Sequence, residues 1–266
     1  MPVSNRWRAA AALSLLTVSI LLTGCGGGGA IGNTSTARLR SLDAAVNPGN
    51  TADILVNGAA NYGDQTYFGA ANNLIASPYN YIGPQNGVAL SYYLPNQTLP
   101  SGAAASSNTG NITTDNYYTA VLIGSYSANY AATPTDPRVL QTVLLPPRSA
   151  PTANSATLRV MNAAPDIGFS SVLNGTTSSY TIGSVTIAIG SPAVTTFSSI
   201  TYGTVSLYQT LPPGTYPVTV TQLGSGGGPV TTTTTSITVA GNTVYTLYLT
   251  EPTASPLTYD LKLLPD

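Results

Sequence analysis

Apolar and hydroxyl residues alternate along much of this chain. Segments 216–221 (YPVTVT) and 245–250 (YTLYLT) place Tyr, Val or Leu at every second position and mostly Thr between them. A period of two is typical of a β-strand with one buried face and one solvated face. Turn-forming clusters such as 211–214 (LPPG) and 240–242 (AGN) separate these segments. The pattern predicts short antiparallel strands joined by tight turns.

The second half of the chain shows this pattern most clearly. About seven short strands in roughly 110 residues are typical of an immunoglobulin-like antiparallel β-sandwich. The Cys-Trp-Cys core of antibody domains is absent, so the likeness concerns architecture alone. The strands are drawn from segments 156–163, 170–175, 184–190, 204–211, 214–223, 233–241, 242–251 and 260–266.

The chain also repeats itself. Residues 37–58 (ARLRSLDAAVNPGNTADILVNG) are similar to residues 156–175 (ATLRVMNAAPDIGFSSVLNG), and Leu39 lies 119 residues before Leu158. Self-similarity of this kind indicates a tandem duplication of one structural unit. We therefore predict two β-sandwich modules and three further segments. These are a signal peptide (1–24), a tether (25–36), the first module (37–147), a Pro-rich linker (148–155) and the second module (156–266).

The middle of the first module departs from the repeat and is rich in Tyr, Asn and Gly. We expect its segment 101–111 to be an exposed loop. Tyrosines with amide neighbours could form a surface that binds a sugar or a protein, because the rings stack while the polar groups hydrogen-bond. The alternative is that they are ordinary strand and core residues. The candidates for ligand binding are Tyr79, Tyr81, Tyr92 and Tyr93.

The N-terminal segment predicts where the protein resides. Arg6 and Arg8 precede the uncharged stretch 9–22, which has the length of a signal-peptide core and is shorter than a membrane-spanning helix. The order Leu22-Thr23-Gly24-Cys25 resembles the bacterial lipobox. This resemblance implies that a signal peptidase recognises Leu22, Thr23 and Gly24 and cuts before Cys25, which carries acyl chains such as palmitate.

Several acyl chains anchor a protein stably, so the membrane becomes a partner through the lipid. We expect a bacterial cell-envelope location. Gly26, rather than Asp, follows the cysteine, and by resemblance to lipoprotein sorting signals this favours the outer membrane. An ordinary secretory leader with a chance cysteine is the alternative.

Charge and residue usage exclude several function classes. Only 6% of residues are charged, and the segment after the leader carries six basic and nine acidic residues, a net charge of −3. No nucleic-acid partner is expected from this balance. The chain has no histidine, which excludes Ser-His-Asp and Cys-His catalysis and His-based zinc sites. We predict no catalytic residue, no metal and no cofactor.

Carboxylates leave two minor alternatives open, a calcium site and a hydrolase that uses two acidic residues. Asp43 and Asp166 follow the first predicted strand of each module. Aspartate in such a position usually caps a turn through its own backbone, which is the role we expect for both.

Four segments of the second module resemble the domain-of-unknown-function family 4397. They are LRVMNAAPD at 158–166, SSVLNG at 170–175, LPPGTYPVTV at 211–220 and ITVAGNTVYTLYL at 237–249. Asn162 stands where that family often has His, and the first module fits less well, with Val46 in place of a Pro. The resemblance implies a β-sandwich at the bacterial envelope, often in tandem, and brings no established activity.

Together these features predict a non-enzymatic cell-envelope lipoprotein with a structural or binding role. The alternative is an adhesin-like surface protein that binds carbohydrate or matrix through the Tyr/Asn-rich part of the first module. A glycan or another envelope protein is the expected partner.

Overall fold

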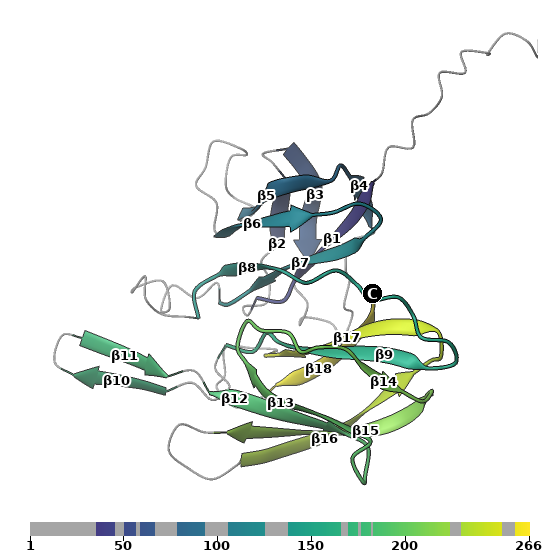
Figure 1. Ribbon diagram of the computed structural model, residues 1–266. Coiled ribbons are helices and arrows are strands. Elements are labelled where there is room, and N and C mark those ends of the chain that lie inside the picture. Colours follow the sequence, from purple (N-terminus) through teal and green to yellow (C-terminus); the bar gives the residue numbers. More distant parts are fainter. Residues whose placement is uncertain are drawn as a thin grey trace, which may run out of the picture. The chain divides into compact units, whose positions relative to one another are not determined.

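The described part of the chain consists of β-strands, turns and irregular segments (Figure 1). A computed structural model describes residues 36–45, 51–56, 59–66, 79–93, 106–125, 138–165, 170–174, 177–181, 183–223, 230–251 and 259–266. Residues 36–266 form one compact unit. The all-β prediction is confirmed. The predicted signal peptide lies outside the described residues, as does the tether apart from Thr36.

The first half contains two sheets that enclose one core. One sheet has the order β4-β1-β7-β8 and the other β3-β2-β5-β6. Leu39 and Ala120 from the first sheet pack against Leu90 and Tyr92 from the second, and all four side chains are buried. The strands are β1 (Ala37–Asp43), β2 (Thr51–Val56), β3 (Ala59–Thr66), β4 (Asn80–Ile82), β5 (Gln85–Tyr93), β6 (Ser106–Ile112), β7 (Tyr117–Ile123) and β8 (Gln141–Leu144).

The second half repeats this arrangement with sheets β14-β9-β17-β18 and β13-β12-β15-β16 and adds the hairpin β10-β11. Its core includes Leu158, Ile187, Val218 and Leu247, all fully buried. The strands are β9 (Ala156–Asn162), β10 (Ser170–Asn174), β11 (Thr177–Thr181), β12 (Ser184–Ile189), β13 (Thr195–Thr201), β14 (Gln209–Leu211), β15 (Gly214–Leu223), β16 (Val230–Val239), β17 (Thr243–Thr250) and β18 (Asp260–Pro265). The sandwich prediction is therefore confirmed.

Each half has one parallel pair at its centre. β1 pairs with β7 in parallel, and β9 pairs with β17 in the same way. The other strand pairs among the described residues are antiparallel, as predicted. Parallel neighbours need a long connection, and here most strands of each half lie between the two paired strands in the sequence. The first and last long strands of each half thus lie side by side.

Equivalent positions in the two halves make the same local hydrogen bonds. Asp43 Oδ1 accepts the Ala45 backbone N–H at 3.0 Å, and Asn162 Oδ1 accepts the Ala164 N–H at 3.1 Å. The predicted turn-capping role of Asp43 is therefore observed. Its counterpart by position is Asn162, and not Asp166 as the sequence suggested; Asp166 lies outside the described residues. A side-chain oxygen two residues upstream of an N–H serves this turn in both halves.

The two halves share a third buried cluster. It joins Leu42 and Val121 of the first half to Met161, Tyr248 and other residues of the second half. The strands β1, β7, β9 and β17 are therefore covered on both faces, and their burial patterns are nearly continuous. The prediction of a solvated face for segment 245–250 is wrong, because Thr246 and Thr250 are buried there. Segment 216–221 does show the predicted half-buried alternation.

Three local predictions differ from the structure. Segment 101–111 was expected to be an exposed loop, but 106–111 belongs to β6, which pairs with β5. Most of the β6 side chains are exposed, so its sequence lacks the apolar alternation that indicates a strand. The strands β11 and β13 were not predicted, and segment 204–211 forms only the short β14.

The connector between the halves is held by hydrogen bonds at both ends. The backbone N–H of Arg148 donates to Tyr117 O at 2.9 Å, and the N–H of Asn154 donates to Asn242 Oδ1 at 2.9 Å. The described sheets each take their strands from one side of this connector. The exact module bounds given above stay a prediction.

Candidate functional site: an arginine and tyrosine cluster

The residues predicted for lipidation and signal-peptide processing, Cys25, Leu22, Thr23 and Gly24, lie outside the described residues. The same holds for the side chain of Tyr93. The other three predicted ligand-binding tyrosines are described, and the structure separates them into two groups.

Tyr92 is a core residue. Its side chain is fully buried, and its hydroxyl lies 2.8 Å from Ser41 Oγ and donates to the carbonyl of Ala120 at 3.1 Å. A buried phenol needs such partners, because an unpaired hydroxyl would lose its bonds to water. Tyr92 therefore cannot be part of a ligand-binding surface in this structure, which corrects the sequence-based prediction.

Tyr79 and Tyr81 lie in a cluster of aromatic and charged side chains that we call the Arg–Tyr cluster. Its members come from β1, β4, β7, β9, the connector and the segments next to β4, β14 and β18. They are Arg38, Arg40, Arg148, Arg159, Tyr79, Tyr81, Tyr117, Tyr208 and Asp266.

The buried part of the cluster is built twice. Arg40 Nε donates to Thr119 Oγ1 at 3.0 Å, and Arg159 Nε donates to Thr246 Oγ1 at 2.9 Å. Each threonine lies on the strand that pairs in parallel with the strand of its arginine, and the two residues are register partners. The same arginine–threonine bond therefore fixes both guanidinium groups.

Asp266 joins the two arginines. Its carboxylate forms an ion pair with Arg40 at 2.7 Å and with Arg159 at 3.3 Å, and it also accepts bonds from Thr246 at 2.7 Å and Tyr208 at 3.0 Å. All three charged side chains are at least nine-tenths buried. Buried charges require partners of this kind, so Asp266 fixes both arginines electrostatically.

A tyrosine covers each buried arginine. The Arg40 guanidinium lies 5.0 Å from the centre of the Tyr79 ring, and the Arg159 guanidinium lies 4.7 Å from the centre of the Tyr208 ring. Burial raises the pKa of both tyrosines above the ordinary value of 10.0. The carboxylate of Asp266 raises the pKa of each further. Both phenols therefore stay neutral at physiological pH.

The solvent-facing part of the cluster has no such duplicate. Arg38 is the register partner of Tyr81 on β4 and of Tyr117 on β7, so these three residues form a row across the sheet, which we call the outer row. The guanidinium lies 5.1 Å from the Tyr81 ring centre and 4.6 Å from that of Tyr117. It donates to the Tyr117 hydroxyl and, at 3.4 Å, to the Tyr81 hydroxyl. Tyr81 is 67% exposed.

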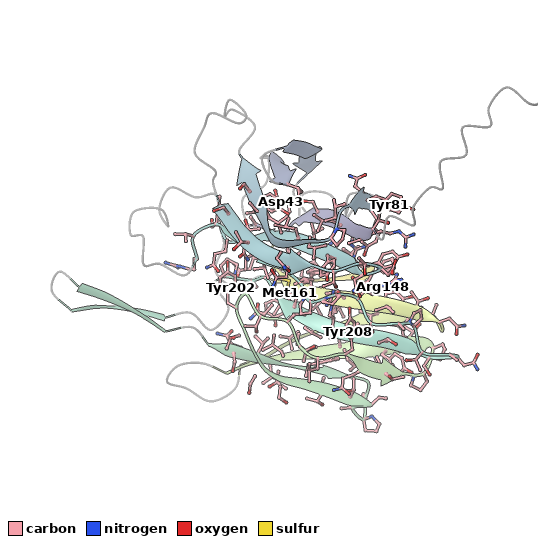
Figure 2. The ribbon with its side chains drawn as sticks, turned by 45° about the horizontal axis from the view of Figure 1, so that its top comes forward. Asp43, Tyr81, Arg148, Met161, Tyr202 and Tyr208 are labelled. Atoms are coloured by element: carbon pink, nitrogen blue, oxygen red, sulfur yellow. The ribbon has the colours of Figure 1, made fainter. Side chains whose placement is uncertain are left out.

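Arg148 adds a second guanidinium beside the outer row. It lies 4.0 Å from the centre of the Tyr117 ring and donates to the main-chain oxygen of Asp266 at 2.7 Å. Tyr79 packs edge-on against the same ring, with 5.2 Å between the ring centres. Figure 2 shows Tyr81, Arg148 and Tyr208 on one flank of the molecule, Tyr202 on the opposite flank and Met161 between them.

The chemistry of the cluster suits binding. Guanidinium groups remain protonated in proteins and donate up to five hydrogen bonds, and aromatic rings offer apolar faces. No three His, Cys, Asp or Glu side chains gather within the described ranges in the way that a metal site requires. None of the described residues belongs to a helix with the length and apolar character needed to cross a bilayer.

Residues 171–265 match the family model "Domain of unknown function (DUF4397)". The resemblance predicted from the sequence is thus confirmed for this region. The DUF4397 match runs from β10 to β18 and begins after β9, so the opening segment 158–166 and the first half lie outside it. The chain has no match among curated proteins.

Sequence reasoning missed most of the Arg–Tyr cluster, although one signal was present. Residues 79–82 (YNYI) are similar to residues 208–211 (YQTL), and both precede a Pro within two positions. This similarity pairs Tyr79 with Tyr208, the two tyrosines that cover the buried arginines in the structure. The contribution of Arg148 and Asp266 has no such signal, because they meet only through packing of the two halves.

Proposed function

We propose that this chain is a non-enzymatic lipoprotein of the bacterial cell envelope, held by a lipid on Cys25, and that it acts by binding. The observation that carries the binding role is the outer row, in which an arginine and an exposed tyrosine face solvent together. An arginine binds anionic groups and a tyrosine ring stacks on the rings of a ligand, whereas both side chains are poor acid–base catalysts. The lipobox-like order Leu22-Thr23-Gly24-Cys25 supports the anchored location.

The anchor is tested by labelling cells with an alkyne analogue of palmitate and fractionating them. The chain contains one cysteine, so label on the protein reports Cys25 directly. We expect the wild-type protein to carry the label and sediment with the outer membrane, and Cys25→Ala to lose the label and the membrane association. A Gly28→Ala variant in the tether is the matched control and should behave as wild type. Membrane sedimentation of Cys25→Ala would contradict the proposal.

A second candidate is an adhesin-like protein that binds carbohydrate or matrix through the Tyr/Asn-rich part of the first half. The exposure of Tyr81 favours this candidate, because a solvent-facing ring can stack on a sugar. A glycan array tests it. We expect ligands to be lost with Tyr81→Ala and retained with Val194→Ala, which removes an exposed apolar side chain in the other half. A blank array for the wild-type protein would rule this candidate out.

A further inference from the structure

The duplicated halves show which parts of the Arg–Tyr cluster the fold needs. The buried part occurs in both halves with the same bonds, as Arg40–Thr119 and Arg159–Thr246. The outer row differs. At the registers that hold Tyr81, Arg38 and Tyr117 in the first half, the second half has Thr210, Thr157 and Val244. A complete sandwich therefore forms without an arginine or a tyrosine in this row.

The outer row also carries the positive charge of Arg38, which pairs with no carboxylate among the described residues. Four of the five arginines beyond residue 36 belong to the cluster, whereas the segment after the leader has a net charge of −3. The Asp266 carboxylate contacts Arg40 and Arg159. Among the described residues, Arg38 has tyrosine partners and no carboxylate partner, whereas Arg148 packs on the Tyr117 ring and donates to a main-chain oxygen of Asp266. Both are half-buried, so they hold their charge at a fixed place near the surface.

The exposed ring beside these cations adds a second kind of recognition. Tyr81 presents one aromatic face to solvent, and its hydroxyl lies within hydrogen-bond distance of the Arg38 guanidinium. A ligand that fits has an anionic group for the guanidinium and an adjacent ring with apolar and hydroxyl-bearing edges. A sugar that carries a carboxylate, sulfate or phosphate meets both conditions.

We propose that the outer row and Arg148 form a binding site for an acidic sugar unit of a glycan. The guanidinium of Arg38 takes the anionic group, with Arg148 adding to the local positive potential. The ring of Tyr81 stacks on the sugar. A nucleic acid fits less well, because its affinity depends on many phosphate contacts and the chain as a whole is acidic. The proposal deepens the binding role described above and rests on it.

The test uses the second half as a template for a variant that should fold. Arg38→Thr, Tyr81→Thr and Tyr117→Val together install the Thr210–Thr157–Val244 row in the first half. The full chain, purified in detergent, is titrated calorimetrically with galacturonate oligosaccharides, heparin oligosaccharides and neutral dextran. Lys262→Gln, which removes one positive charge elsewhere, is the control. Arg38→Gln alone is measured beside the triple variant, so that the test survives if that variant misfolds.

We expect the wild-type chain and Lys262→Gln to bind at least one acidic oligosaccharide, more weakly as salt rises, and to bind dextran weakly or not at all. Both outer-row variants should lose about tenfold or more in affinity with little change in melting temperature, as expected for the loss of a charge-assisted hydrogen bond. Unchanged affinity in these variants would overturn the proposal.

Three further outcomes overturn it in different ways. Equal binding of dextran would leave the adhesin-like candidate standing but remove the anionic site. Displacement by sodium sulfate or phosphate at the same concentration as the oligosaccharide would show that an ion, and not a sugar, is recognised. Absence of binding to any of the three polymers would reject both the acidic-sugar site and the adhesin-like candidate. The palmitate label would still report the lipid anchor independently.

Discussion

The carboxylate of Asp266 lies between two arginines from equivalent positions of the two halves. Arg40 and Arg159 each approach it within 3.3 Å, and each also donates to a carbonyl, Pro265 O and Pro146 O respectively. The two guanidiniums and the carboxylate are buried, so the free-energy cost of their desolvation must be offset by these contacts. Removing the carboxylate would take from both buried guanidiniums the opposite charge that they contact among the described residues.

Asp266→Asn should therefore destabilise the protein by about 3–5 kcal/mol, the usual loss when one partner of a buried ion pair is removed. The control is Asp260→Asn, which breaks the ion pair with Lys262 at a site where the aspartate side chain is 39% exposed. We expect that change to cost at most about 1 kcal/mol. Urea unfolding at neutral pH measures both, and similar losses in the two variants would show that Asp266 is not an electrostatic centre.

Tyr81 and Tyr92 show how far the exposure of a single residue can be predicted from the sequence. Both lie in the same Tyr/Asn-rich segment, and the sequence placed both on a ligand-binding surface. In β5 the buried residues Val88, Leu90 and Tyr92 share one face with a period of two, which the sequence does display. Tyr81 lies on the three-residue strand β4, which is too short to show a period, so no alternation in the sequence separated it from a buried tyrosine such as Tyr92.

At the scale of elements, the sequence predicts strands well and their environment less well. The bounds predicted for β15 agree with the structure, because its apolar residues alternate and one face stays partly solvated. The error at β17 has a physical cause. Thr is compatible with either a solvated face or a buried one, and Thr246 is buried in β17, where its hydroxyl donates a hydrogen bond to the Asp266 carboxylate. Contacts between distant segments decide such cases.

The strands β7 and β17 begin with the same device. The Tyr118 hydroxyl accepts the backbone N–H of Thr113 at 3.1 Å, and the Tyr245 hydroxyl accepts that of Ala240 at 3.1 Å. A tyrosine that ties a strand to the turn five residues upstream resembles the tyrosine corner of β-sandwiches. The device holds the turn that starts each parallel central strand.

Tyr118→Phe and Tyr245→Phe should each cost about 0.5–1.5 kcal/mol, the net value of one hydrogen bond. The loss should be larger at Tyr118, because its bond is partly buried, and its hydroxyl also pairs with Thr113 Oγ1 at 2.9 Å. The bond at Tyr245 is exposed, so water can replace it. Chemical denaturation of each variant gives the two values, and a greater loss at Tyr245 would contradict this reasoning.

At the scale of the whole molecule, the two halves are coupled by what lies between them. Leu42, Val121, Met161 and Tyr248 form part of one apolar cluster, and Asp266 bridges arginines from both sides. Separation of the halves would expose this apolar surface and unpair the buried charges at the same time. The connector is also fixed to the two halves, because hydrogen bonds hold it at Arg148 and Asn154.

We therefore expect the described unit to unfold in a single cooperative transition. Leu39→Ala and Leu158→Ala remove equivalent side chains, fully buried in the core of the first and second half respectively. Each should cost about 2–5 kcal/mol and lower the same melting transition in scanning calorimetry. Leu207→Ala changes a leucine that is 86% exposed, so it should leave the melting temperature unchanged. Two separate transitions, each moved by only one variant, would mean that the halves fold independently and that the Asp266 bridge contributes little.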